Sequence, residues 1–535
     1  MRYLTALATF SCCLLANVAA YAGAPSAASA ADTTAAALSA TSAAATDYSL
    51  PQLGIAGGVA LPLWKAHFMG EQIFHLIQGE DGVLNDPLVE SYVNYVGHRL
   101  SSVAQGPDEP YHYFVVMDPD INAFALPGAF VGVNYGLILA TQSEDELAGV
   151  MAHETAHVSL RHIARQMADA TYNNLVDLAL LLGGIAAAVA APGIGVGAVM
   201  GGIGVGMQRG INYTRAHEFA ADRVGIMILA RARFKPQGMV NFFKYMESQA
   251  GLVGYQLPQF LSNHPLDITR IAEAENRAKD LHIHPLPENP NYALMRARIR
   301  VLTSDDLAGT LAWFEGQVKT ETNPWYRKAA VYGMVLCLNR LDSGKRALKL
   351  IRPLANSHPN NIALQLGLAE SLLAAKQNKA GLDSLAQDHV LYPENLAVTG
   401  AYARALINAN QASKAVIVLK PLMDPDASVF DPDLYQLLAI AANKTGDKTL
   451  ALRAMTYGYN LVGDFHSAII QLRLILRDPK LTPVERTLVE RHKKALEAER
   501  KKAKRMGLTD QGPGFENSKN SRGHFEIDAG SIPPP

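Results

Sequence analysis

The residues from His153 to His157 read His-Glu-Thr-Ala-His, which places two metal-binding side chains four positions apart with an acid between them. On a helix, side chains four apart lie on the same face about one turn apart, so both imidazoles can reach one ion. Zinc takes nitrogen ligands at about 2.0–2.1 Å, and this spacing supplies two of them with little strain. Glu154 points away from the pair but stays close enough to accept a proton from water at the metal. The segment therefore predicts a catalytic zinc centre in which Glu154 is the base.

The residues just before this segment predict the helix that the chemistry needs. Ser143-Glu-Asp-Glu146 has the form of a capping box, in which the serine and the second glutamate satisfy free backbone amides of the first turn. We therefore expect the two histidines in the second half of a helix that begins near residue 143. Its buried face is predicted by the apolar residues Leu147, Val150 and Met151.

A catalytic zinc site needs a third protein ligand and an open position for water. His162 is a poor candidate, because five residues after His157 a continuing helix has turned by about 140°. Glu218 and Asp222 are four residues apart and share one helical face if their segment is a helix. We expect Glu218 to bind the metal and Asp222 to hydrogen-bond a liganding imidazole. The alternative is that this pair is two surface carboxylates on an amphipathic helix.

Taken together, the stretch His153–His162 and the motif Glu218–Asp222 about sixty residues later resemble the gluzincin family that includes the HtpX-type and CAAX prenyl-type zinc peptidases. The segments Asn122–Gly128 and Asn263–Arg270 resemble motifs that flank the site in that family. The resemblance implies an α+β zincin-like metallopeptidase domain that binds one Zn²⁺ per chain and hydrolyses peptide bonds. One position departs from the family pattern: Ala129 stands where relatives usually have a second glycine, and alanine has less backbone freedom.

The resemblance also suggests how a substrate is held. The run from Asn122 through Ala123 and Phe124 into Phe130–Val133 resembles an edge strand beside the cleft. An extended peptide can add to such an edge through main-chain hydrogen bonds, which relaxes sequence specificity. An ordinary interior strand is the alternative. Arg270 is a weaker candidate for orienting the cleft and contacting the substrate.

His264 belongs to the downstream motif, which lies near zinc in the family. Three roles are open for it. It can act in catalysis by donating a hydrogen bond to the oxyanion of the tetrahedral intermediate. It can instead occupy the fourth coordination position and hold the enzyme inactive, or it can be a structural histidine.

Helical periodicity dominates the rest of the first half. Apolar residues recur about one turn apart from Leu88 to Val103, whereas Tyr113–Met117 and Phe130–Val133 are short β-like runs. We expect a mostly α protein with a small β element, in which the zinc metallopeptidase domain covers residues 48–285.

The second half repeats with a period of 34 residues. Pro359 and Pro393, each followed by a polar turn, lie one period apart, and Ala347, Gly381 and Ala415 keep the same period. Small residues at helix crossings, proline between units and this period are the signature of tetratricopeptide arrays. We expect an α-helical tetratricopeptide solenoid over residues 295–480, with an irregular helical domain as the alternative.

The two ends of the chain differ from its middle. A positive start, an apolar stretch and an Ala-Tyr-Ala site predict an export signal over residues 1–22, cleaved near Ala22, and hence a periplasmic protein. Once it is removed, Cys337 is the one remaining cysteine, so an internal disulfide is excluded. The Ala/Ser/Thr-rich residues 23–47 predict a flexible linker, and residues 481–535 predict a basic helix and a disordered tail.

Residues 175–207 are hydrophobic and rich in glycine and alanine. Leu175–Ala191 is just long enough to suggest a membrane span. However, Asp177 lies inside this run, and Pro192 with its neighbouring glycines breaks the helical pattern after it. We expect a helical hairpin that covers the cleft as a lid or makes peripheral contact with a membrane surface.

The formal net charge of -1 argues against nucleic acid as a partner. The resemblance and the layout point to an endopeptidase that degrades misfolded or misassembled proteins of the cell envelope, including outer-membrane proteins. The array would recruit these substrates or the barrel assembly machinery, because such arrays bind segments of other proteins. The rival hypothesis is a chaperone or scaffold whose zinc site is largely silent because His264 blocks it.

Overall fold

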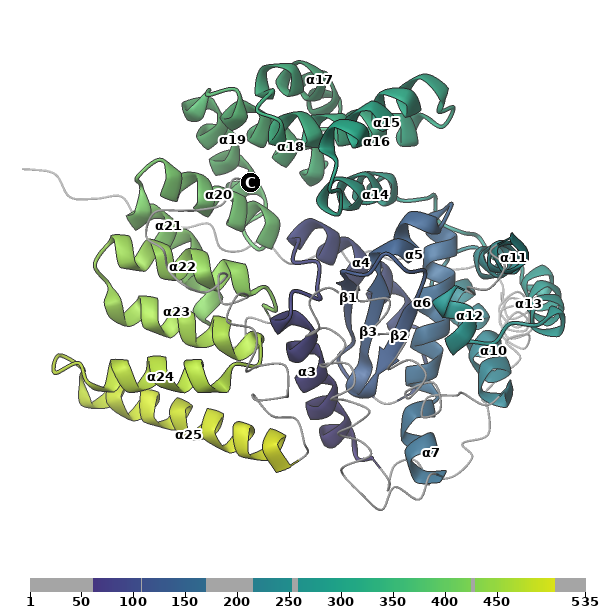
Figure 1. The fold of residues 1–535 in the computed structure, drawn as a ribbon, viewed down its shortest axis with the longest axis horizontal. Coiled ribbons are helices and arrows are strands. Elements are labelled where there is room, and N and C mark those ends of the chain that lie inside the picture. Colours follow the sequence, from purple (N-terminus) through teal and green to yellow (C-terminus); the bar gives the residue numbers. More distant parts are fainter. Residues whose placement is uncertain (1–60, 107, 170–214, 253–257, 425–428, 506–535) are drawn as a thin grey trace, which may run out of the picture. The chain divides into compact units, whose positions relative to one another are not determined.

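A computed structural model describes residues 61–106, 108–169, 215–252, 258–424 and 429–505. All of them belong to one unit that spans residues 55–535. Helices dominate, and the strands of the described residues form one three-stranded sheet (Figure 1), which confirms the prediction of a mostly α protein with a small β element. In these ranges no helix is both long and apolar enough to cross a membrane. The predicted export signal, linker, hydrophobic hairpin (175–207) and C-terminal tail lie outside the described residues.

The sheet joins β1 (His112–Val116), β2 (Ala123–Leu126) and β3 (Phe130–Asn134) in the order β1-β3-β2. β3 runs parallel to β1 and antiparallel to β2. Residue 132 is a glycine where the ring of Phe124 crosses β3, because a Cβ atom on Gly132 would lie 2.6 Å from that ring. The Phe124 ring of β2 therefore packs directly against the backbone of the central strand β3.

A left-handed turn divides the predicted edge strand in two. Gly128 has a φ of 73° and Ala129 a φ of 65°, so the chain reverses after β2 and returns as β3. Left-handed backbone costs a residue with a side chain about 1–2 kcal/mol, which is why glycine suits position 129. The prediction of one edge strand from Asn122 to Val133 was wrong for its second half. β3 is the central strand, and β2 lies at an edge.

Helix α6 (Glu144–Ser159) carries the first motif and is buried along almost its whole length. The Glu146 amide donates a hydrogen bond of 3.3 Å to Ser143 Oγ, and the Glu146 carboxylate accepts one of 2.7 Å from the Gln142 amide. The predicted helix start is confirmed. α6 packs against β2 and β3 and also against α10 (Arg215–Arg231) and α11 (Gln237–Leu252).

A close crossing of α10 with α6 positions the second motif. A Cβ atom on Gly225 of α10 would lie 3.2 Å from the backbone nitrogen of His153 on α6, so only glycine allows this approach without a shift. Glu218 lies two turns earlier on α10 and is thereby brought beside the two histidines. The other helices of this half are α3 (Leu63–Gly79), α4 (Pro87–Ser101), α5 (Tyr135–Ala140), α7 (His162–Asp169), α12 (Gln259–Asn263) and α13 (Ile268–Asp280).

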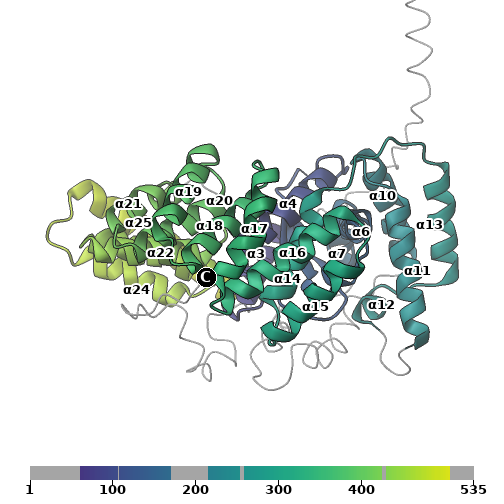
Figure 2. The same ribbon diagram turned by 90° about the horizontal axis from the view of Figure 1, so that it is seen from above.

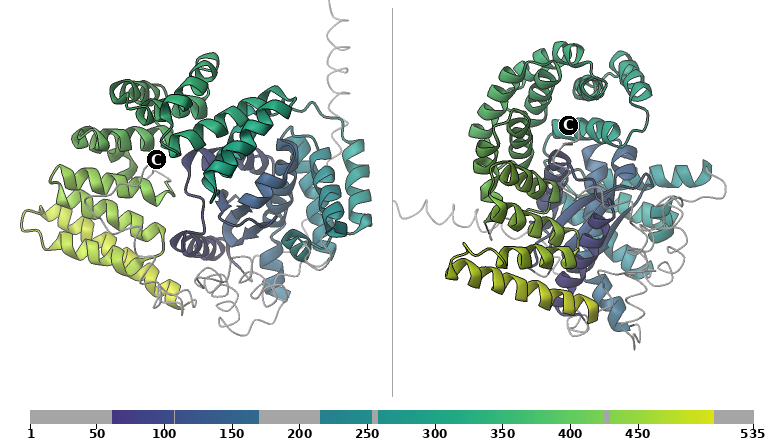
Figure 3. Two further views of the ribbon diagram at one scale, coloured as in Figure 1. Left: turned by 45° about the horizontal axis from the view of Figure 1, so that its top comes forward. Right: turned by 60° about the vertical axis from the view of Figure 1, so that its left-hand side comes forward.

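From residue 290 onward, successive helices pack against one another as antiparallel neighbours (Figures 2 and 3). Three alternate helices begin at Gly344, Asn378 and Ala412, which keeps the 34-residue spacing in this part of the chain. The helices are α14 (Pro290–Leu302), α15 (Leu307–Thr320), α16 (Pro324–Arg340), α17 (Gly344–Ser357), α18 (Ile362–Ala374), α19 (Asn378–Leu391), α20 (Leu396–Asn408), α21 (Ala412–Leu419), α22 (Pro432–Lys444), α23 (Lys448–Leu461), α24 (Phe465–Leu476) and α25 (Pro483–Arg505).

The small residues of the repeat lie where the helices meet. Ala347, Gly381 and Ala415 are all buried. A Cβ atom on Gly381 would lie 2.7 Å from the side chain of Leu373 on the preceding helix. This burial is the physical reason for the periodic small residues. The assignment of the array to the tetratricopeptide class stays a prediction.

One ion pair ties the helical array to the first half of the chain. Arg298 of α14 donates hydrogen bonds of 2.7 and 2.8 Å to the two carboxylate oxygens of Asp86. Asp86 also caps α4, because its Oδ1 accepts a hydrogen bond of 3.1 Å from the Val89 amide. The same carboxylate therefore fixes the start of α4 and the position of α14.

Candidate metal centre

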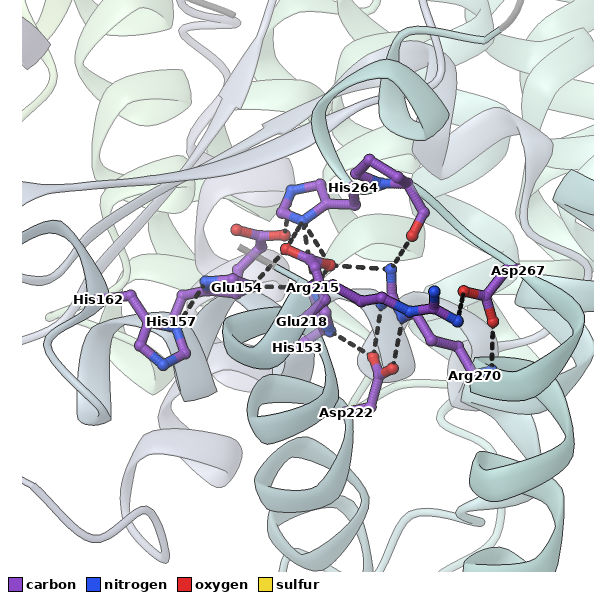
Figure 4. A network of polar contacts seen from close by, with 11 residues as sticks. His153, Glu154, His157, His162, Arg215, Glu218, Asp222, His264, Asp267 and Arg270 are labelled. Atoms are coloured by element: carbon purple, nitrogen blue, oxygen red, sulfur yellow. Dashed lines mark hydrogen bonds and ion pairs between the residues drawn. The ribbon is translucent and has the colours of Figure 1, made fainter. Parts of the chain in front are cut away.

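Three separate parts of the chain meet at one buried cluster. His153 and His157 lie on α6, Glu218 lies in the first turn of α10, and His264 directly follows α12. All four side chains are buried, and one ligand atom from each lies within 4.8 Å of the others. Figure 4 shows Glu218 and His264 meeting over the helix that carries the two histidines. The His153–His157 motif and the Glu218–Asp222 motif, which are about sixty residues apart in sequence, therefore meet in the fold.

The donor atoms have the spacing that a tetrahedral zinc site requires. With zinc–ligand bonds of about 2.0–2.1 Å, donors at the corners of a tetrahedron lie roughly 3.3 Å apart. His153 Nε2 lies 3.0 Å from His157 Nε2 and 3.3 Å from His264 Nδ1. Glu218 Oε1 lies 3.5 Å from His157 Nε2 and 3.1 Å from His264 Nδ1, and Glu218 Oε2 lies 3.4 Å from His153 Nε2. Imidazole nitrogens and a carboxylate are donors that zinc prefers, so these residues fit a zinc ion.

His264 stands at the fourth corner of this cluster. Its Nδ1 faces His153 and Glu218, and its Nε2 lies 3.4 Å from Glu154 Oε1. Its ring stacks on Phe260, with ring centroids 4.9 Å apart, and its amide donates a 2.7 Å hydrogen bond to the Phe260 carbonyl. His264 Nδ1 is therefore a fourth candidate ligand atom beside those of His153, His157 and Glu218.

The Glu154 carboxylate is buried beside the donor atoms. Its side chain is fully enclosed, and its Oε1 lies 3.4 Å from Nε2 of His264. Burial raises the pKa of Glu154, because the enclosed carboxylate has lost the water that would stabilise its charge. An enclosed carboxylate with a raised pKa is well suited to accept a proton.

Asp222 and Arg270 contact the candidate ligands His153 and Glu218. Asp222 Oδ1 lies 3.0 Å from His153 Nδ1, which is the arrangement expected for a carboxylate that orients a liganding imidazole. Arg270 donates hydrogen bonds of 2.7 and 2.8 Å to the two oxygens of Asp222, and its Nη1 lies 2.9 Å from Glu218 Oε2.

Arg270, a candidate for orienting the cleft and contacting the substrate, is buried among residues of the cluster, and its contact with a substrate stays a prediction. Its side chain is 1% exposed, and its guanidinium is engaged with Asp222, Glu218 and the Pro265 carbonyl. Arg270 lies six residues after His264 in the first turn of α13, where its guanidinium reaches Asp222 and Glu218. Its positive charge holds the two carboxylates in place.

The charges of the cluster prepare it for a cation. Burial disfavours a charged His153, but Asp222 and Glu218 outweigh burial and raise the pKa of His153 to about 10. Burial acts to raise the pKa of Glu218, but His264 and His153 hold it well below its usual range. The two carboxylates therefore favour a positive charge at His153, and a metal cation can take the place of that proton.

His162 lies beside the ligands, although its spacing from His157 made it a poor candidate for the third ligand. Its Nδ1 is 3.0 Å from the Nδ1 of His157, and its ring stacks on His217 with centroids 4.3 Å apart. The 140° estimate assumed that the first helix continues, but α6 ends at Ser159 and Arg161 adopts a left-handed φ of 53°. This turn brings His162 back toward the ligands. A histidine soon after the motif was the available signal for this residue in the sequence. The sequence did not show that the helix ends before it.

The residues predicted to hold a substrate lie beside the cluster. Asn122 is buried, and its Oδ1 accepts a hydrogen bond of 3.3 Å from Asn263 Nδ2, next to His264. Ala123 and Phe124 follow in the edge strand β2, which packs against α6. Ala123 is buried and Phe124 is half-buried. Asn122 therefore links the edge strand to the turn that carries His264.

Comparison with known proteins agrees with this geometry. A sequence model of peptidase family M48 matches residues 87–278, which include every residue of the cluster. The chain is 32% identical over 431 residues to the beta-barrel assembly-enhancing protease of Escherichia coli O157:H7, covering 79% of this chain and 85% of that protein. It is 30% identical over 414 residues to the protein of that name from Yersinia pestis (76% and 83%). Over 184 residues it is 31% identical to the mitochondrial metalloendopeptidase OMA1 of Schizosaccharomyces pombe (34% and 51%).

Proposed function

This chain belongs to peptidase family M48 and is a metalloendopeptidase, and from this premise we propose that it hydrolyses misfolded or misassembled proteins of the cell envelope with one zinc ion. His153, His157 and Glu218 would hold the ion. The observation that carries the proposal is the tetrahedral spacing of the buried donors beside the enclosed carboxylate of Glu154. A catalytic zinc site needs a base beside its donors, and a structural site does not.

The residues around the site divide the work of hydrolysis. When bound, zinc supplies Lewis-acid activation of water and of the scissile carbonyl. Glu154 accepts the proton of the attacking water on its carboxylate and passes it to the nitrogen of the leaving amine. The peptide C–N bond breaks, and the products are a carboxylic acid and an amine. Asp222 and Arg270 keep His153 and Glu218 oriented throughout.

Metal removal tests the proposal directly. We expect that dialysis of the full chain against a chelator abolishes hydrolysis of unfolded casein, and that one equivalent of zinc restores it. Zinc content is measured by elemental analysis in the same samples. Hydrolysis that persists in protein free of metal would contradict the proposal.

His264 would act as a gate if its Nδ1 took the coordination position that water or a substrate carbonyl needs, and its place among the clustered donors supports this role. We expect His264→Ala to raise casein hydrolysis, since it frees this position and leaves the other three donors in place. Phe260→Leu serves as the control: it removes the ring stacked on His264 while leaving the imidazole itself. A fall in hydrolysis for His264→Ala, measured at saturating zinc, would instead assign His264 to oxyanion stabilisation.

The substrate would lie along the edge strand β2. The main chain of Ala123 and Phe124 offers hydrogen bonds to an extended peptide, and β2 packs against α6, which carries Glu154. Recognition by main-chain groups suits an enzyme whose substrates share an unfolded state more than a sequence.

The cellular role is inferred from the relatives and from the layout of the chain. The relatives from Escherichia coli and Yersinia pestis are named for enhancing beta-barrel assembly. We infer that this protein acts in the periplasm on outer-membrane proteins, and that its helical array recruits them or the assembly machinery. The export signal predicted over residues 1–22 supports this location.

A chaperone or scaffold role is the second candidate, and the position of His264 favours it, because a blocked site is catalytically silent. Cells that carry a Glu154→Gln protein distinguish the two. Full function in such cells would favour the scaffold, and complete loss would favour proteolysis.

A further inference from the structure

His157 presents its two ring nitrogens to different neighbours. Its Nε2 faces the donor cluster, 3.0 Å from His153 Nε2 and 3.5 Å from Glu218 Oε1. Its Nδ1 faces away from the cluster and lies 3.0 Å from Nδ1 of His162. Both rings are buried, at 1% exposure each. The pairing is therefore enclosed by protein and belongs to the immediate surroundings of the metal centre.

The chemistry of imidazole assigns the protons in this pairing. A neutral imidazole carries one N–H, and the other nitrogen has a lone pair. To bind a metal through Nε2, His157 must carry its hydrogen on Nδ1. That N–H points at His162 Nδ1, which must then offer a lone pair and carry its own hydrogen on Nε2. The distance of 3.0 Å is that of an ordinary N–H···N hydrogen bond.

We propose that His162 is a positioning residue that accepts the Nδ1 hydrogen of His157, fixes the metal-binding tautomer and so sets the zinc affinity of the site. This inference rests on the zinc-dependent function proposed above. It gives each histidine of the first motif its own acceptor: Asp222 for His153 and His162 for His157. The two acceptors differ in kind, since Asp222 is a carboxylate paired with Arg270 and His162 is a neutral ring.

The turn between α6 and α7 provides the geometry for this role. α6 ends at Ser159, the left-handed Arg161 reverses the chain, and His162 begins α7. The reversal brings the His162 ring to His157, with ring centroids 4.9 Å apart. The ring of His217, next to Glu218 in sequence, stacks on the His162 ring. The acceptor is therefore held between the two segments that carry the ligands.

Two substitutions of similar shape separate this role from packing. In His162→Asn the side-chain oxygen takes the place of Nδ1, so an acceptor remains, whereas His162→Leu has the same branching and no acceptor. We expect the leucine variant of the full chain to bind zinc roughly 10–100-fold more weakly, the usual effect of losing such a partner. The asparagine variant should bind zinc with an affinity much closer to that of the wild type. Affinity is measured by competition with a zinc chelator.

Thermal unfolding of the metal-free proteins supplies the second measurement. A role in packing alone lowers the melting temperature of the metal-free leucine variant without changing its zinc affinity. The positioning role lowers zinc affinity and leaves the metal-free melting temperature close to that of the wild type. His75→Leu, at a buried histidine of α3 outside the ligand cluster, controls for the loss of an enclosed imidazole.

Each outcome decides the matter. Weak zinc binding by the leucine variant with rescue by asparagine supports the inference. Unchanged zinc binding by the leucine variant, or equal weakening by both variants, overturns it. A wild-type protein that binds no zinc would overturn the proposed function itself. If the leucine variant does not fold, His162→Gln replaces it, because the longer side chain places its amide near the position of Nε2, away from His157.

Discussion

Replacing Glu154 by glutamine is expected to slow peptide hydrolysis by orders of magnitude while zinc remains bound. Glutamine keeps the shape of the side chain but cannot accept the proton of the attacking water. General acid–base catalysis contributes about 10²–10⁴-fold to a rate, so casein hydrolysis should fall by a factor in this range. Glu154 is beside the donors and is not one of the four clustered ligand residues, so zinc content should stay at that of the wild type.

The control for this substitution is Glu247→Gln, which makes the same chemical change at an exposed position on α11. It should leave both hydrolysis and zinc content unchanged. A Glu154→Gln protein that hydrolyses casein at the wild-type rate would show that another group accepts the proton. Such a result would leave the metal centre in place and remove the assigned base.

Replacing Glu218 by alanine is expected to cost the protein its zinc. Glu218 is the one carboxylate of the clustered donors, and its negative charge lies 3.4 and 3.5 Å from the metal-facing nitrogens of His153 and His157. Without it, the site loses a ligand and the charge that offsets the dication. The decrease in affinity should exceed the roughly 10–100-fold expected when only a hydrogen-bonded partner of a ligand is lost.

Asp222→Asn is the matched comparison for Glu218→Ala, because it changes the partner of a ligand and leaves all donors in place. We expect a graded series by chelator competition, in which the Asp222 variant lies between the wild type and the Glu218 variant. The fold should survive the loss of Glu218, since Arg270 keeps two hydrogen bonds to Asp222. Full zinc occupancy in a folded Glu218→Ala protein would contradict the ligand assignment.

The sequence by itself determined the local parts of this site. The spacing of His153 and His157 predicts two donors on one helical face, because the period of a helix is a property of the local backbone. The capping box at Ser143 predicts where that helix begins, and the structure places its start there. Glu218 and Asp222 were assigned by the same local argument, aided by a resemblance. The small residues of the 34-residue period are likewise a local pattern repeated along the chain.

Only the tertiary structure decided the rest, because those features depend on where the chain turns and which residues it then meets. A left-handed residue at Arg161 brings His162 to His157, and another at Ala129 makes β3 a central strand. The sequence offered Arg270 as a candidate for orienting the cleft, and the fold after His264 brings it to two buried carboxylates. A helix has a regular period, so the spacing of residues in the sequence predicts it. A single residue with a positive φ changes the direction of the chain after it, and no repeating pattern in the sequence marks its position.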